Sequence, residues 1–438
     1  MTDRNYYTWQ DYVQSQDKPA LLLEAVRAYK QSDTFRTALE ATAYFRGENL
    51  TVGRKTVLRA GKVDYTDESG LRRSRAVTRD VVGNRISSGF LFRFVTQQTQ
   101  YLLGNGVTLE KPWLKRRLGT DFDRQLAYMG ERALLHGVCW ALWDRGHMEV
   151  MEAAVNPLSG FLPLRDELTG EAVAGIHFWQ INAQRPMYLR LLEPKGRTLY
   201  RAEGEKGLSV VWPLRPWRLR FRDMRAPLIP LYANPERRSE FTASIKSKID
   251  AYDNILSDFA DNLDRANDVY WVLNNFGGTV EDIAQTLETI NRLKAVASYS
   301  DGTGSASAEP HTLSVPYEAR QAALKLLERA LYRDWMALDT EELTGGSLTN
   351  VAIRAASAGL DLKANRFEWQ CFRFVRELLR LLGTDTDGIR FRREPIANQS
   401  ETVRDIAAMR GDIDRKTALR LNPYLQPEEA DALAQAAN

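Results

Sequence analysis

The chain has few of the residues and patterns that assign a chemistry from sequence alone. It holds only two cysteines in 438 residues, Cys139 and Cys371, too few for a disulfide framework or a zinc site built mainly from thiolates. Both lie in apolar stretches, so we expect core positions and a reducing compartment. The four histidines show no metal-ligand spacing. The sequence therefore predicts no catalytic residue, no metal and no cofactor.

Long apolar runs and an excess of one charge are also missing. Mean hydropathy is −0.41, and no run reaches the roughly eighteen apolar residues of a membrane span. The N-terminus lacks the basic start and apolar run of a signal peptide. With 60 Lys and Arg against 57 Asp and Glu, the net charge is +3. This balance excludes a protein that coats nucleic acid through bulk positive charge.

The nearest approach to a nucleotide-binding motif lies between Gly47 and Thr56. A phosphate loop needs Lys directly after its second glycine, but Arg54 intervenes here before Lys55. We therefore interpret residues 54–79 as a basic surface loop.

The local patterns predict a mixed α and β chain. Helical spacing is seen up to about residue 60, from Asn84 to Leu103 and over 122–136. Residues 137–232 are instead short β-branched and aromatic runs separated by Gly, Pro and charged turns, typical of antiparallel strands. The length of the chain predicts about two to three domains.

One helix after residue 235 is unusually regular. Its apolar residues recur every three or four positions and predict a continuous stripe; they are Phe241, Ile245, Ile249, Tyr252, Leu256, Phe259 and Leu263. Another face carries acids with almost no basic partners, namely Asp250, Asp253, Asp258, Asp261 and Asp264. A solvated helix face is the ordinary explanation, but the missing i,i+4 ion pairs point to a further role.

The sequence after this helix predicts an insert followed by a second long helix. Residues 268–315 read as a strand, a short helix, a polar loop and a strand, and Pro316 suits the start of a second long helix. A loop around Gly345 and Gly346 comes next, followed by a helix over about 350–382 that Thr349 or Asn350 would cap. The remaining residues predict two or three short helices broken at Gly411 and Pro423.

Four segments in this order resemble the portal proteins of tailed bacteriophages, in particular those of Bacillus siphophages. The segments are NRISSGFLFRFVTQQTQYLLGNGVTL (84–109), SKIDAYDNILSDFADNLDRANDVYWVL (247–273), SLTNVAIRAASAGLDLKANRFEWQCF (347–372) and MRGDIDRKTALRLNPYLQPEEADAL (409–433). The second is the most specific of the four.

The resemblance implies an α+β portal fold with an α/β wing, a two-helix stem, a small α/β clip, a long helix after a tunnel loop, and a helical crown. The implied boundaries are 1–235 for the wing, 236–267 for the first stem helix, 268–314 for the clip, 315–338 for the second stem helix, 339–349 for the tunnel loop, 350–385 for the long helix and 386–438 for the crown.

The resemblance also implies roles. The protein would form a ring, usually a dodecamer, at the capsid vertex of the virion, after assembly in the host cytoplasm. The ring would pass double-stranded DNA and dock the terminase large subunit and the head–tail connector, among major capsid and scaffolding proteins. The tunnel loop would face DNA through Thr344, Gly345, Gly346, Ser347 and Leu348.

Within such a ring the acidic helix face would line the channel and repel phosphate, and the apolar stripe would pack between subunits. Two alternatives stay open: another virion structural adaptor without the long helix pair, or a nuclease-like head-maturation protein with a metal-binding carboxylate cluster.

Overall fold

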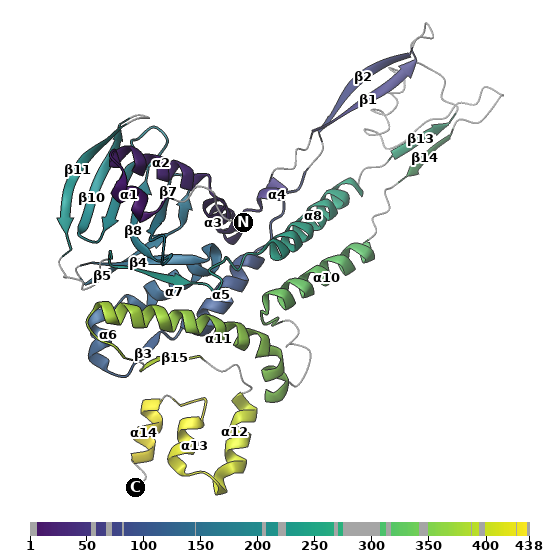
Figure 1. Cartoon of the computed structure of the whole chain (residues 1–438). Coiled ribbons are helices and arrows are strands. Elements are labelled where there is room, and N and C mark those ends of the chain that lie inside the picture. The colour runs from purple at the N-terminus through teal and green to yellow at the C-terminus, as the bar shows by residue number, and fades with distance from the viewer. Residues whose placement is uncertain are drawn as a thin grey trace, which may run out of the picture. The chain divides into compact units, whose positions relative to one another are not determined.

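The computed structural model describes most of the chain and divides it into two compact units. The described residues are 7–53, 58–66, 72–80, 83–144, 146–203, 207–217, 225–266, 270–274, 307–311, 317–340, 349–386, 388–393, 399–425 and 427–435. Unit 1 comprises Met1–Leu50, Gly89–Ser247 and Ala330–Asn438, and unit 2 comprises Thr51–Ser88 and Lys248–Arg329. Figure 1 shows their elements.

Unit 1 is built on two antiparallel sheets. The larger has the strand order β11-β10-β9-β8-β7-β6 and the smaller the order β12-β4-β5. Their strands are β4 (Val138–Asp144), β5 (His147–Glu152), β6 (Ala154–Asn156), β7 (Ser159–Arg165), β8 (Ala172–Trp179), β9 (Tyr188–Glu193), β10 (Gly196–Glu203), β11 (Gly207–Pro216) and β12 (Leu228–Tyr232).

Helices cover both outer faces of this pair of sheets (Figure 1). On β7, alternation sends Leu162 and Leu164 toward the N-terminal helices and Phe161 toward the smaller sheet. The helices on the first side are α1 (Trp9–Gln14), α2 (Lys18–Lys30) and α3 (Asp33–Phe45). The smaller sheet packs against α7 (Phe122–His136), which ends at Gly137 with a positive φ of 85°.

The remainder of unit 1 is mostly helical. Helices α5 (Phe90–Leu103) and α11 (Asn350–Leu381) pack on each other, and α11 also packs on β12. Other elements are the pair β3 (Val107–Leu109) and β15 (Ile389–Phe391), α6 (Pro112–Leu118), α12 (Gln399–Ala408), the 3-10 turn η1 (Met409–Gly411), α13 (Arg415–Leu421) and α14 (Pro427–Gln435).

Unit 2 holds two hairpin-like strand pairs and most of two long helices. Its strand pairs are β1 (Leu58–Thr66) with β2 (Arg72–Asp80) and β13 (Tyr270–Asn274) with β14 (Ser307–His311). The helices α8 (Ala243–Ala266) and α10 (Tyr317–Trp335) each have residues in both units, and the short α4 spans Leu50–Gly53. None of the described helices is long and apolar enough to cross a membrane.

The edge strand β11 departs from regular pairing. It carries Pro213 and Pro216, and its register with β10 shifts twice, between Arg197 and Leu199 and again before Tyr200. Its side chains Val210, Val211, Trp212 and Leu214 are exposed. An apolar edge therefore coexists with two features that break a regular ladder.

The fold confirms the mixed α and β class and several predicted elements. The β region, the helices at 122–136 and 350–382, and the short C-terminal helices all form. Both cysteines are buried. A second strand of the insert spans Ser307–His311, while the predicted insert helix and residues 312–315, the rest of the strand predicted at the end of the insert, lie outside the described residues.

Two predicted elements were wrong. Residues 54–79, interpreted as a basic loop, contain the paired strands β1 and β2. The helix expected from Asn84 begins only at Phe90, because the described residues 83–89 are not helical. The amides of Asn84, Ile86 and Ser88 donate to α8 instead of to a helix of their own.

A buried histidine joins two helices of unit 1. His136 Nε2 lies 2.9 Å from Thr42 Oγ1. Burial, aided by the nearby charge of Arg132, lowers the pKa of His136 from 6.5 to about 3. Between those pH values the unfolded chain binds a proton that the folded chain does not, so stability present above pH 6.5 is lost as pH falls toward 3.

We expect His136→Gln to weaken this acid sensitivity, since glutamine can keep a hydrogen bond to Thr42 but does not gain a proton. The wild-type free energy of unfolding should fall by about 2–3 kcal/mol more than that of the variant between pH 6.5 and 4.5. Urea unfolding at several pH values measures this. His147→Gln, at an exposed position, is the control and should keep the wild-type pH dependence; identical curves for both variants would refute the prediction.

Candidate functional site

The helices α8 and α10 form an antiparallel pair (Figure 1). Within unit 1, Lys363 Nζ contacts both a residue just before α8 and the end of α10: it lies 3.2 Å from Glu240 Oε2 and donates to the Trp335 carbonyl at 3.0 Å. Within unit 2, the rings of Phe259 and Tyr317 lie 5.7 Å apart, joining the late part of α8 to the first residue of α10. The two helices therefore run side by side in opposite directions.

The roots of this pair are deeply buried. Trp335 stacks on Phe94 with ring centroids 5.5 Å apart, and Lys363 Nζ lies 3.7 Å from the Trp335 ring centroid. Burial lowers the pKa of Lys363 to about 8, and the Glu240 carboxylate opposes this shift. At this junction the buried ammonium has a salt bridge to a carboxylate, a hydrogen bond to a helix-end carbonyl and a cation–π contact with an aromatic ring, which together offset the cost of burying its charge. Lys363 thus ties both helices to α11.

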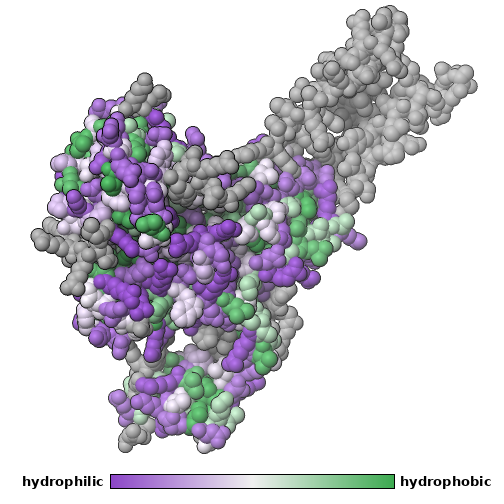
Figure 2. All heavy atoms as spheres, viewed as in Figure 1, coloured by the Kyte–Doolittle hydropathy of each residue, from purple (hydrophilic) through white to green (hydrophobic). Residues whose placement is uncertain are grey.

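The far parts of the same helices are not buried in this way. No described residue of α10 before Leu331 is buried, and Tyr317 and Leu326 are 54% and 66% exposed. On α8, Leu263 is 48% exposed. Figure 2 shows hydrophobic side chains, in green, gathered on this pair. Since most helical stability in proteins comes from packing of an apolar face, these halves lack part of their expected partner surface.

The apolar stripe predicted on α8 is consequently split in two. Phe241, Ile245 and Ile249 are buried within the chain itself, so they offer no surface to another subunit. The expectation that these three pack between subunits is corrected here. Tyr252, Leu256 and Phe259 are partly buried and Leu263 is exposed.

The acidic face of α8 holds an extended segment of its own chain. Asp253 Oδ1 accepts from the Ser88 amide at 3.0 Å, and Asp261 Oδ1 accepts from the Asn84 amide at 2.6 Å. Between them, Ser257 Oγ accepts from the Ile86 amide at 3.0 Å and donates to the Asp253 carbonyl at 2.7 Å. We call residues 84–88 the strap.

The strap fits because two periodicities match. Four residues of helix rise about 6 Å, and two residues of extended chain advance about 6.6 Å. The steps from Asp253 to Ser257 to Asp261 can therefore meet every second amide of the strap, running in the opposite direction. Side-chain acceptors spaced at i, i+4 and i+8 along the acidic face were the available sequence signal.

This geometry revises the acidic face predicted to line a channel. Asp253 is fully buried, and Asp261 is occupied by the strap. Asp250 accepts from the Thr51 hydroxyl at 3.0 Å. Asp258 is exposed, and the side chain of Asp264 lies outside the described part of the chain. Asp253 is thus removed from any solvent-facing role, and Asp258 is the exposed acid among those described.

The segment between α10 and α11 begins and ends on fixed points. Gln97 on α5 makes two hydrogen bonds to the backbone of Leu338, one from the Leu338 amide at 3.0 Å and one to its carbonyl at 2.9 Å. At the other end, Thr349 caps α11 through its side chain, as predicted, and Asn350 bonds to Glu401 and Thr402. The predicted loop residues Thr344, Gly345, Gly346, Ser347 and Leu348 lie outside the described residues.

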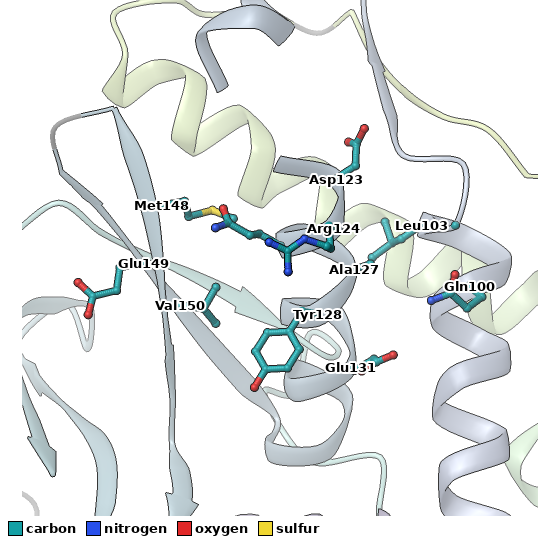
Figure 3. A pocket seen from close by; sticks show the side chains of 12 residues that line it. Gln100, Leu103, Asp123, Arg124, Ala127, Tyr128, Glu131, Met148, Glu149 and Val150 are labelled. Carbon is teal, nitrogen blue, oxygen red and sulfur yellow. The ribbon is translucent and has the colours of Figure 1, made fainter. Parts of the chain in front are cut away.

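A hollow of about 800 Å³ opens in unit 1 between α5, α7 and β5 (Figure 3). Tyr128 and Glu131 line it from α7, and burial raises the pKa of both side chains, that of Glu131 against the opposing charge of Arg132. The Tyr128 hydroxyl donates to Glu152. Across the described ranges, no group of three or more His, Cys, Asp or Glu side chains is placed to hold a metal ion.

Comparison with known proteins assigns the chain to a family. A family model described as phage portal protein, SPP1 Gp6-like, matches residues 78–438. The portal protein of Clostridium phage phiCD119 is 25% identical over 448 residues, covering 94% of this chain and 95% of that protein. The portal protein of Bacillus phage SPP1 is 28% identical over 223 residues, which cover 47% of this chain and 43% of that protein.

The protein is therefore of the phage portal class. More specifically, the chain belongs to the SPP1 Gp6-like family of phage portal proteins.

We expect Asp253→Ala to release the strap, since the partly buried Ser88 amide loses its acceptor at a cost of about 1–3 kcal/mol. Hydrogen–deuterium exchange of the assembled protein should show the strap amides exchanging about tenfold faster or more. Asp258→Ala, at an exposed position of the same helix, is the matched control. Unchanged exchange in the Asp253 variant, or equal changes in both, would show that the strap does not depend on this carboxylate.

Proposed function

We propose that copies of this chain stand side by side in a ring, with the α8–α10 pairs forming the wall of a bore for double-stranded DNA. The observation that carries the proposal is a contrast along the same two helices: their roots have buried apolar residues, and the described side chains of their far halves include no buried apolar residue. The apolar positions that remain for a neighbour are Tyr252, Leu256, Phe259, Leu263 and Leu326. A closed ring covers them by a head-to-tail contact repeated around the axis.

In this ring the structure's parts take the portal roles. Residues 236–267 and 315–338 are the stem, 268–314 the clip that docks the terminase large subunit and the head–tail connector, 339–349 the tunnel loop, 350–385 the long helix and 386–438 the crown. The wing keeps most of 1–235, but residues 51–88 group with the stem helices in unit 2. Major capsid and scaffolding proteins meet the ring at the capsid vertex, and the chain supplies no catalytic step.

The hydrogen-bonded ends at Leu338 and Thr349 suit a tunnel loop on which moving DNA exerts force. A loop that follows moving DNA transmits force to its attachment points. Here those points are held by side-chain hydrogen bonds from α5 and from α12.

The exposed acid of α8 suits a wall that does not bind its cargo. A basic lining would bind phosphate with a steep salt dependence and slow its passage. An acid at Asp258, repeated in every copy, instead repels the polyanion and leaves it free to slide.

The purified chain should form a ring of about 0.6 MDa, which is the mass of twelve copies of ~50 kDa each under closed symmetry. Light scattering and negative-stain imaging measure the mass and shape. Replacing Leu263 and Leu326 by Asp should shift the chain toward smaller species, because charges would enter the contact between neighbours. Only monomers or dimers of the wild-type chain at every salt concentration would contradict the proposal.

Asp258→Lys should reduce DNA packaging in a defined assay several-fold while leaving rings intact, since a ring of cations would replace the acids at the wall. Glu203→Lys changes charge by the same amount at an exposed position of the wing sheet and should package normally. Normal packaging by the Asp258 variant would place this residue away from the bore.

A further inference from the structure

Helix α11 has an outward face that is both apolar and basic. Its members follow one another at spacings of four, three and four residues, which places them on one side of the helix; they are Leu362, Arg366, Trp369 and Arg373. All four are exposed, Leu362 by 62% and Trp369 by 71%. Phe372 extends the apolar part, since its ring centroid lies 6.1 Å from that of Trp369. We call the four residues the tryptophan face.

The tryptophan face lies opposite the side of α11 that packs into the core. Phe367 is 1% exposed, and its ring lies beside Gly130 of α7. Two residues turn a helix by about 200°, so Trp369 points away from α7. Single exposed apolar residues are ordinary, but Leu362 and Trp369 are aligned about 10 Å apart along a rigid helix. Tryptophan and arginine are also the side chains that contribute most often to binding at protein interfaces.

The exposed charges of α11 have one sign. The structure describes every residue of this helix, and its exposed charged side chains are all arginines, namely Arg354, Arg366, Arg373 and Arg380. Arg366 and Arg373 pair with Glu236 and Glu377 of their own chain, yet their side chains stay 54% and 53% exposed. A guanidinium has five N–H donors, so each can also bind a second carboxylate. A partner for this face should therefore be acidic with an apolar centre.

The hollow between α5, α7 and β5 has this complementary charge. Its charged lining residues are three acids, Asp123, Glu131 and Glu149, and one base, Arg124, which leaves a net charge of −2. Asp123 and Glu149 pair with cations of their own chain. Glu131 lies 3.9 Å from Arg132, which is a long distance for an ion pair. The Glu131 carboxylate can therefore bind a further cation.

The apolar part of the hollow suits an aromatic side chain. Leu103 of α5 and Met148 and Val150 of β5 line it (Figure 3), and methionine makes favourable contacts with aromatic rings. Its volume of about 800 Å³ lies within the range of roughly 300–1,000 Å³ for sites that enclose a small organic ligand. The Tyr128 ring is held by a hydrogen bond to Glu152 and lies 5.1 Å from the Arg132 guanidinium. Such a preformed wall lowers the entropy cost of docking.

We propose that the tryptophan face of one copy docks into the hollow of the neighbouring copy, with Trp369 among the apolar side chains and the arginines beside the acids. This rests on the proposed ring and adds a contact separate from the α8–α10 wall. A head-to-tail contact needs two different patches on each copy. Both patches lie in unit 1, and a copy does not fill its own hollow, because Trp369 points away from α7.

The test places a photo-reactive aromatic amino acid, benzoylphenylalanine, at position 369 of the full-length chain. Irradiation of the assembled protein should join neighbouring copies covalently. Mass spectrometry of the peptides should then find the second attachment point on the parts of α5, α7 and β5 that line the hollow. The same probe in place of Trp212, which is exposed on β11, is the control and should not attach there.

The strength of the contact is measured with Trp369→Ala. Loss of a buried tryptophan at an interface should raise the protein concentration at which rings dissociate by about tenfold or more. Trp212→Ala removes an exposed tryptophan of the same unit and should leave that concentration unchanged. Circular dichroism of both variants shows whether the fold is kept, since Trp369 has little contact with the core to lose.

Intact rings in which the probe at position 369 attaches to another segment, or to its own copy alone, would overturn the docking. Equal dissociation of the Trp369→Ala and wild-type rings would also overturn it. Attachment of the probe to DNA or to another virion protein would assign the face to that partner and overturn it as well. Light scattering on the same samples separates the two proposals: rings without this contact leave the proposed bore in place, whereas absence of wild-type rings contradicts both.

Discussion

The helix pair α8 and α10 depends on the buried contacts around Trp335. Helix α8 begins near this junction and α10 ends at it, and farther along neither helix has a buried apolar residue among the described side chains. Lys363 fixes both by meeting Glu240 near the start of α8 and the last carbonyl of α10. Because a buried charge that loses its partners is far more costly than an apolar contact that loses one, this junction admits few alternative arrangements.

The acids of α8 have two different environments: some accept hydrogen bonds from the strap, and one is exposed. Asp253 and Asp261 accept backbone amides from the strap, and a carboxylate is a strong acceptor for such donors. Asp258 is exposed on the same helix. The acids of this helix are therefore explained in part by backbone donors that lie more than 160 residues away in the chain, and counting charges along the helix does not reveal these pairings.

Sequence patterns predicted what local periodicity controls. The stripe on α8, the cap at Thr349 and the strands of residues 137–232 all follow from spacing that a short window contains. The strap was missed because its residues continue the helical pattern of α5 upstream, while their amides are committed to a distant helix. The β1–β2 hairpin was missed because its strands alternate between basic and small residues, so the usual apolar signal of a strand is weak.

The irregular edge of β11 bears on how the protein avoids aggregation through its sheet edge. A chain that must gather in many copies risks joining through open sheet edges, which have no natural stopping point. Pro213 and the two register shifts deny an incoming strand a regular row of donors and acceptors. Fibre growth by backbone pairing between subunits is thereby discouraged. Closed oligomers with a fixed number of subunits can then form in preference to fibres when the subunit concentration is high.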